Sequence, residues 1–302
     1  MYFGLILRPN IWTRPLKNTV GVTAGLEAYK EMKTRILTAA IAIPLLLLIL
    51  LAVPKELVAV IWGAMMSIAA YELLACTGLI REKRLVIYAC IMAFAVTIWS
   101  GYGAIHAYAV LGVMVFVGLM FAEMMLSHVK VTFDRVCMVL VGGLLVPYLL
   151  SSMVRILIMS IGRYVILIPF IIAFTSDSGA YFAGMFFGKH KMAPVISQHK
   201  TVEGAIGGVV AAMVGMLIYA LIMQVFFDFK VYYAYALVYG LLGSVVGVFG
   251  DLCFSIVKRQ TGIKDYGSLI PGHGGILDRF DSMMMVAPLM EVLLLIIPIV
   301  EA

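Results

Sequence analysis

Long apolar stretches separated by short polar connections set the pattern of this chain. Stretches of roughly 17–25 apolar residues are long enough to cross about 30 Å of hydrocarbon as helices. The stretches lack the period-two alternation of membrane β-strands, which argues against a barrel. The pattern predicts an all-α polytopic membrane protein with about nine transmembrane helices, at about 36–53, 57–77, 85–100, 104–126, 136–158, 164–187, 204–226, 232–257 and 282–300.

Composition agrees with that class. The 302 residues are 64% hydrophobic and 13% charged, whereas a soluble domain carries about 25% charged residues. The four cysteines, Cys76, Cys90, Cys137 and Cys253, are scattered singly and show no CxxC or Cys/His spacing for zinc or redox chemistry. We interpret them as ordinary packing residues.

The basic residues predict the orientation. The net charge is +6, and all but four of the 22 Lys and Arg residues fall on one side of the predicted membrane. The exceptions are Lys55, Arg155, Arg163 and Lys230. Basic residues gather on the cytoplasmic side, so the N-terminus is expected in the cytoplasm and the C-terminus on the opposite side. Cations between apolar spans meet lipid phosphates, which argues against a nucleic-acid partner.

The chain divides into three predicted parts. Residues 1–31 form a mixed segment with no sustained apolar run and no secretory signal. Met32 then opens MKTRILTA, in which cations precede a span, as at a natural start. We therefore expect an N-terminal extension over 1–31, either juxtamembrane or not native. N-terminal transmembrane helices follow over 32–160, and C-terminal catalytic helices with a cytoplasmic loop over 161–302.

One stretch, from Gly250 to Ser282, concentrates polar chemistry in a chain that otherwise has few charges. A charged group near hydrocarbon costs several kcal/mol unless it is paired, hydrated or bound to a metal. The stretch is therefore predicted to form a site. Its charged or titratable residues are Asp251, Lys258, Arg259, Lys264, Asp265, His273, Asp278, Arg279 and Asp281.

Helical spacing places several of these groups together. Asp251 and Lys258 share one helix face with the small residues Ser244, Gly247 and Ser255, so this face should look into a cavity or a helix interface. A buried Asp–Lys pair that only holds the bundle together is the alternative.

The acids and glycines that follow favour a phosphate site. Asp278 and Asp281 are three residues apart, so their carboxylates should point the same way. Together with Asp251 they form a set of hard oxygen ligands suited to Mg²⁺. Gly274 and Gly275 precede a helix, where backbone N–H groups can approach an anion, although such a glycine-rich run can also be a simple turn.

A second group of polar residues lies upstream. Asp177 is placed near mid-membrane, where an acid is functional by default. Thr201 is expected to cap the next helix, with Glu203 in its first turn. Lys200 suits either a lipid headgroup or a nucleotide phosphate. Glu72 and Glu123 end two spans and are expected to cap or to reach the membrane surface.

The run from Ser255 to Asp281, SIVKRQTGIKDYGSLIPGHGGILDRFD, resembles the signature of the phosphatidate cytidylyltransferases (CDP-diacylglycerol synthases). The resemblance extends from Met32 to the C-terminus and leaves residues 1–31 without a counterpart. It implies condensation of CTP with phosphatidic acid to CDP-diacylglycerol and pyrophosphate with Mg²⁺, at the cytoplasmic face of a bacterial inner or plasma membrane. It also implies a homodimer and a monovalent cation such as K⁺ beside Mg²⁺.

The resemblance further assigns roles to residues. Asp251 and Asp278 would hold the metal, supported by Asp281, and the cations would meet the phosphates of CTP and lipid. Asp177 and the upstream polar residues would help to frame the nucleotide. The expected catalytic residues are Asp251, Lys258, Arg259, Lys264, Asp265, His273, Asp278 and Arg279, and the expected substrate-binding residues are Asp177, Ser197, Lys200, Thr201, Glu203, Gly274 and Gly275.

The chemistry of the residues agrees with this reaction. A phosphate monoester is already an anionic nucleophile at neutral pH, so neutralisation and in-line alignment suffice and no Ser/His triad is needed. Three alternatives remain. They are a cation-coupled transporter using Asp177 and Asp251, a CDP-alcohol phosphatidyltransferase, whose Asp-Gly and Ala-Arg motif does not fit this run, and a cytidylyltransferase acting on another lipid phosphate.

Overall fold

The computed structural model describes residues 23–102, 106–127, 130–272 and 274–301. Residues 1–22, which make up most of the predicted N-terminal extension, and His273 lie outside the described residues. Nearly all of the described chain is helical, which confirms the predicted all-α class.

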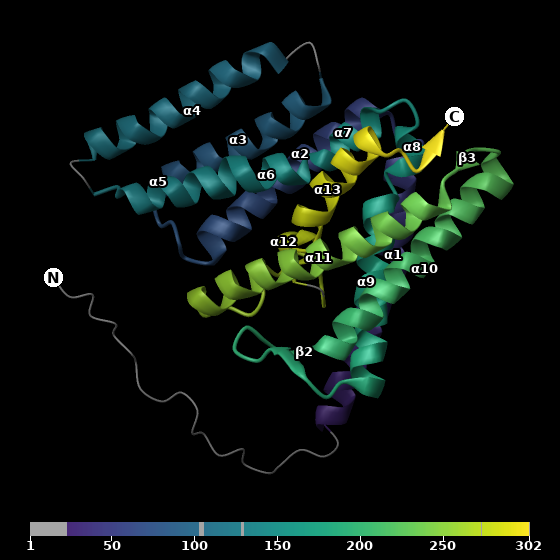
Figure 1. Cartoon of the computed structure of the whole chain (residues 1–302). Coiled ribbons are helices and arrows are strands. Elements are labelled where there is room, and N and C mark those ends of the chain that lie inside the picture. Colours follow the sequence, from purple (N-terminus) through teal and green to yellow (C-terminus); the bar gives the residue numbers. More distant parts are fainter. Residues whose placement is uncertain (1–22, 103–105, 128–129, 273, 302) are drawn as a thin grey trace.

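The first part of the chain forms helices that fold back and forth (Figure 1). The last long helix of this part is broken into four pieces, of which one is a π-helix. The elements are α1 (Thr23–Ala52), α2 (Lys55–Tyr71), the π-helix η1 (Glu72–Cys76), α3 (Lys83–Gly101), α4 (His106–Leu126), α5 (Phe133–Leu140), the π-helix η3 (Val141–Leu145), α6 (Val146–Leu150) and α7 (Ser152–Ile158).

The second part adds three long helices and two small antiparallel sheets. Strand β1 pairs with β2, with Lys191 opposite Thr201, and β3 pairs with β4, with Lys230 opposite Glu301. The elements are α8 (Gly162–Val165), α9 (Ile168–Phe187), β1 (Lys191–Ala193), β2 (Ser197–Thr201), α10 (Val202–Phe227), β3 (Lys230–Val231), α11 (Tyr233–Thr261), α12 (Leu277–Phe280), α13 (Met283–Ile296) and β4 (Val300–Glu301).

Seven helical segments of the described chain are long and apolar enough to cross a membrane. They correspond to the second to eighth predicted spans. The first and last predicted spans contain shorter apolar helices, Ala40–Ala52 and Met283–Ile296. Helix α1 also begins at Thr23, well before the predicted start of the first span at about 36. The last part of the predicted N-terminal extension is therefore helical. The count of nine spans stays a prediction.

Small residues let the C-terminal helices approach closely. A Cβ atom at Gly208 in α10 would lie 2.8 Å from the Ser176 carbonyl oxygen of α9, and one at Gly240 in α11 would lie 2.6 Å from Met213 Cα. Ser244 of α11 is fully buried and shares a 2.7 Å hydrogen bond with Ser176. Ser244 of the predicted small polar face therefore packs against α9, whereas a Cβ atom at Gly247 of the same face would lie 3.1 Å from Val286 of α13.

Helix α13 joins the two parts of the fold. It packs against α6, α7, α9 and α11 and lies between the two groups of helices in Figure 1. Its Glu291 accepts a 2.7 Å hydrogen bond from Arg155 Nε, and Arg155 also donates to Ser100, Ser151 and Ser152. Because α13 begins two residues after Asp281, this half-buried network helps to fix the helix that follows the charged run.

Several connections meet at one end of the bundle. Lys55 Nζ donates to the Met159 carbonyl oxygen at 3.3 Å, and Arg163 donates to that of Val53 at 3.1 Å. The Tyr164 ring packs edge-on against Phe229 with centroids 5.1 Å apart, beside the β3–β4 pair. The charged run lies at the far end of α11 from β3, next to η1 and the β1–β2 hairpin.

Candidate active site

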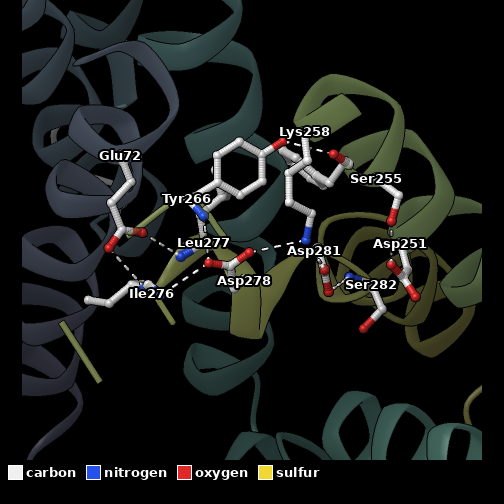
Figure 2. A network of polar contacts seen from close by, with 12 residues as sticks. Glu72, Asp251, Ser255, Lys258, Tyr266, Ile276, Leu277, Asp278, Asp281 and Ser282 are labelled. Carbon is white, nitrogen blue, oxygen red and sulfur yellow. Dashed lines mark hydrogen bonds and ion pairs between the residues drawn. The ribbon is translucent and has the colours of Figure 1, made fainter. Parts of the chain in front are cut away.

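Asp278 lies at the centre of the polar cluster in Figure 2. Its residue is only 6% exposed. Asp278 Oδ2 accepts hydrogen bonds from the backbone N–H groups of Tyr266 at 2.8 Å and Gly275 at 3.0 Å, and Oδ1 accepts from Lys258 Nζ at 3.1 Å. A buried carboxylate needs such partners to remain charged. Asp278 therefore holds both arms of the loop between α11 and α12.

Lys258 links two acids of the charged run, Asp278 and Asp281. Its ammonium group lies 3.1 Å from Asp278 Oδ1 and 3.7 Å from Asp281 Oδ2, so both carboxylates point the same way, as their spacing predicts. Burial and the nearby Asp251 carboxylate raise the pKa of the Asp281 carboxyl to about 7, against the lowering effect of Lys258. An extra positive charge at this place would favour ionised Asp281.

Asp251 connects α11 to the hairpin. Its carboxylate accepts a hydrogen bond from Ser255 one turn further on, at 3.2 Å, and forms an ion pair with Lys200 of β2. Arg259 Nε donates to the Ile196 carbonyl oxygen at 3.2 Å in the turn of the same hairpin. The upstream and downstream polar groups are thus brought together, and Lys200 pairs with an acid of the site.

Glu72 takes part in the site from a distant segment. It is 3% exposed and lies in η1, a π-helix of the kind that often occurs at functional sites. Its two carboxylate oxygens accept the N–H groups of Ile276 at 3.1 Å and Leu277 at 2.8 Å (Figure 2). Glu72 therefore caps the start of α12, a helix far away in sequence, which its place at the end of a predicted span did not indicate. Glu123, the other acid predicted to end a span, is also buried and forms an ion pair with Arg84.

Two glycines make room for Glu72. A Cβ atom at Gly275 would lie 2.5 Å from both Glu72 carboxylate oxygens, and one at Gly267 would also overlap that side chain. No larger residue fits at either position while Glu72 caps α12.

Tyr266 supports the loop from the other side. Its hydroxyl donates to the Phe254 carbonyl oxygen at 2.9 Å, and the two rings pack edge-on with centroids 5.8 Å apart. Lys258 Nζ lies 5.4 Å from the centroid of the same ring. Burial and the charge of Asp278 raise the pKa of the Tyr266 hydroxyl, which keeps it a donor. Sequence reasoning missed both Tyr266 and Glu72.

The glycine-rich part of the loop is a tight turn. Gly274 has a φ of +83°, and the Ile270 N–H donates to its carbonyl oxygen at 2.9 Å. The Gly275 N–H donates to Asp278, so it serves the loop itself. Lys264, Asp265 and Arg279 are exposed around this turn, whereas His273 lies outside the described residues.

The upstream residues form the start of α10. Thr201 caps the helix by accepting the Gly204 N–H at 3.1 Å, as predicted. Glu203 in the first turn accepts the N–H groups of Lys189 and His190. Ser197 lies in β2 opposite Ala193. The sequence prediction of cap and first-turn charge is confirmed.

Asp177 lies midway along α9. It is exposed and, among the residues that the structure describes, makes no hydrogen bond or ion pair. It does lie within electrostatic reach of Asp251, Lys200 and Arg279. A carboxylate in an apolar helix needs water or a charged group beside it, so the place of Asp177 in the site stays a prediction.

The acids can be tested as metal ligands from their present partners. Across 23–102, 106–127, 130–272 and 274–301, no three His, Cys, Asp or Glu side chains form a metal-binding group. Asp278 has its oxygens occupied by two N–H groups and an ammonium group. Asp251 and Asp281 each face a lysine and keep oxygen capacity free. Carboxylates of this kind fit Mg²⁺.

Comparison with known proteins gives the family. A model of the cytidylyltransferase family matches residues 33–297. The chain is 46% identical over 134 residues to the phosphatidate cytidylyltransferase of Staphylococcus saprophyticus, covering 44% of this chain and 50% of that protein. It is 48% identical over 134 residues to the enzyme of the same name from Staphylococcus aureus, with the same two shares. These alignments span about half the length of the relatives. Because the family model covers most of the chain, including the whole site described above, the chain belongs to the cytidylyltransferase family.

Proposed function

We propose that the chain is a phosphatidate cytidylyltransferase, which converts CTP and phosphatidic acid to CDP-diacylglycerol and pyrophosphate in phospholipid synthesis. The observation that carries the proposal is the polar cluster itself. Lys200, Lys258, Asp251 and Asp281 meet beside apolar helices that otherwise carry few charges. Two relatives that share about half their length with this chain bear that enzyme's name.

The reaction requires little acid–base chemistry. An anionic oxygen of the lipid phosphate attacks the α-phosphorus of CTP and forms a new phosphorus–oxygen bond. The bond from that phosphorus to the bridging oxygen breaks, and the electron pair leaves with pyrophosphate. Alignment of two polyanions and neutralisation of their charge are the main needs.

The chain's own residues meet these needs in distinct ways. Lys258 and Lys200 place ammonium groups where phosphate oxygens can replace their present carboxylate partners. Arg259, Lys264 and Arg279 belong to the same charged run and are exposed, so they attract polyanions to the polar cluster. Asp278 acts as a positioning residue, because it holds the loop and orients Lys258.

Mg²⁺ is part of the proposal. Asp251 and Asp281 are the residues that would hold it, with Asp278 behind them. When bound, it would neutralise phosphate oxygens and the charge that develops on pyrophosphate. A monovalent cation such as K⁺ and a homodimer are proposed on the family resemblance alone.

The membrane arrangement also belongs to the proposal. We expect nine spans, with the N-terminus in the cytoplasm of a bacterium, the C-terminus outside and the site facing the cytoplasm. Lys55, Arg163 and Lys230, three of the four cations assigned to the outer side, lie at the bundle end that carries the β3–β4 pair, which supports this orientation. In a cysteine-free background, a membrane-impermeant thiol reagent should label Lys230→Cys from outside and Lys83→Cys only after lysis. The reverse pattern would contradict it.

Pyrophosphate release tests the reaction. The purified full chain in detergent should release pyrophosphate only when CTP, Mg²⁺ and phosphatidic acid are all present. Asp251→Asn should lower kcat by about 10²–10³-fold, the range for loss of one preorganised electrostatic group. Asp228→Asn is the matched control, because Asp228 is exposed in a left-handed conformation that Asn also adopts, at the other end of α10. No release from folded protein would overturn the proposal, and release only with an ether-linked lipid phosphate would change the substrate.

A further inference from the structure

An apolar pocket lies beside the polar cluster, on another face of α11. Its volume is about 610 Å³, within the range of roughly 300–1,000 Å³ that small-molecule sites have. Four parts of the chain form its walls, namely η1 with the connection after it, the broken helix from α5 to α6, the end of α11 and the start of α13. All of its lining side chains are apolar or cysteine except Asp134.

The broken helix is shaped to leave this pocket open. In η3, Gly142 and Gly143 face the neighbouring helices, where a Cβ atom at Gly143 would lie 2.8 Å from Ala89 Cα. Val141 and Leu145 of the same π-helix face the pocket and are 44% and 50% exposed. Gly143 thus brings η3 against α3 and Gly142 brings it against Leu74 of η1, while the large residues present an apolar wall that no described residue covers.

The pocket adjoins the site. Phe254 and Val257 line it from α11, directly beside Ser255 and Lys258 of the polar face. Phe254 also packs against Tyr266, whose N–H holds Asp278 (Figure 2). Met284 and Met285 line it from α13, three and four residues after Asp281. A molecule with its phosphate at Lys258 would meet hydrocarbon walls within one helical turn.

We propose that this pocket binds one acyl chain of the lipid substrate and thereby positions the lipid phosphate beside Lys258. The inference rests on the proposed function. Charge fixes the direction, because Asp134 at the first turn of α5 would repel a phosphate, whereas Lys258, which follows the lining residue Val257 in α11, attracts one. The tail then runs along α5–η3–α6, away from the charged run and toward Leu145 and Leu149.

The pocket is expected to position the lipid phosphate rather than to raise the affinity for the lipid. An acyl chain is already surrounded by hydrocarbon in a bilayer or micelle, so moving it into an apolar pocket changes its surroundings little. Held tails, however, align the phosphate for in-line attack, where small misplacements reduce the rate. Blocking the deep part of the pocket should therefore affect long tails and spare short ones.

Turnover of two substrates tests the position of the tail. Leu145→Trp fills the part of the pocket that is distant from the charged run. Leu111→Trp, at a similarly exposed apolar position of α4, is the matched control. For dipalmitoyl phosphatidate in mixed micelles, Leu145→Trp should lower kcat/KM about tenfold, while the value for the dihexanoyl substrate changes less than twofold. The control should change neither. An equal loss with both substrates, or no loss with either, would overturn the inference.

A binding measurement keeps this outcome separate from the proposed reaction. A phosphatidate with a photoreactive diazirine in one tail is illuminated with the full chain, and the adducts are mapped. Adducts should fall within 137–149 and 253–257, compete with dipalmitoyl phosphatidate and decrease in Leu145→Trp but not in Leu111→Trp. If they form without pyrophosphate release, the tail site stands and the reaction is wrong. Adducts spread over α4, or a second copy cross-linked at this pocket instead of lipid, would overturn the inference.

Discussion

Replacing Glu72 is expected to affect the active site although this residue touches none of the acids or cations proposed to meet substrate. Glu72 is separated from Leu277 by 205 positions in sequence, yet it accepts the N–H groups of Ile276 and Leu277 at the start of α12. Asp278 follows Leu277 directly. A shift at the start of α12 therefore moves the residue that holds the loop and Lys258 together.

The magnitude follows from the two buried donors. Leaving a buried N–H without a partner costs about 1–3 kcal/mol. In Glu72→Gln, the amide oxygen can accept one N–H while the amide NH₂ faces the other, so the expected loss is about 1–3 kcal/mol. In Glu72→Ala both donors lose their acceptor, and the loss is about 2–6 kcal/mol before any cavity is counted.

Two assays on the purified chain measure the effect. Thermal unfolding in detergent should show a lower midpoint for Glu72→Gln and a still lower one for Glu72→Ala. Pyrophosphate release should fall at least tenfold in Glu72→Gln at a temperature where the protein is folded, since misaligned groups lose rate steeply. Glu123→Gln is the control, because Glu123 is also a buried acid but contacts Arg84 and Tyr88 away from the loop.

A double substitution tests the geometry itself. Gly275→Ala alone should destabilise, because its Cβ would lie 2.5 Å from both Glu72 oxygens. In the Glu72→Ala background that overlap is absent, so the second change should cost much less, and the two effects should not add. Wild-type stability and turnover in Glu72→Gln, or additive effects in the double variant, would refute the reasoning.

Three other substitutions have definite expected outcomes. Lys258→Met should cost about 3–5 kcal/mol in thermal unfolding and lower pyrophosphate release, because Asp278 is left as a buried charge without its cation; stability equal to wild type would contradict this. Thr201→Ala should lose about 1 kcal/mol of stability through the helix cap, and Thr201→Ser should recover it. Arg155→Met should destabilise, whereas adding Glu291→Met should restore most of the unfolding midpoint, since removing both charges leaves no half-buried ion without its partner.

Much of the fold was predictable because membrane helices obey local rules. A span must satisfy its own backbone and cover the hydrocarbon with apolar side chains, so its presence can be recognised from length and composition. The Thr201 cap and the common direction of Asp278 and Asp281 also depend on residues three apart. The break of one predicted span into α5, η3, α6 and α7 was suggested by its Gly and Pro residues only in outline.

The roles within the site depended on the tertiary structure. Sequence spacing placed Asp278 among the metal ligands, but its oxygens accept N–H groups from Tyr266 and Gly275, which only the folded loop brings to it. Lys200 could have served either a lipid headgroup or a nucleotide, and the fold pairs it with Asp251. Two features in the sequence hinted at the role of Glu72, namely an acid within an apolar segment and the glycines Gly267 and Gly275. No local rule connects these features, because Glu72 and the glycines lie far apart in the chain.

The sequence by itself determined the membrane class, the helix positions and the family signature, because each follows from hydrophobic length or from residues close in the chain. The tertiary structure decided which buried charge meets which partner, and it formed the apolar pocket from four separate parts of the chain. The physical reason is the same in both cases. A buried charge is costly unless it is paired, and both the partners of these charges and the walls of the pocket come from segments far apart in sequence.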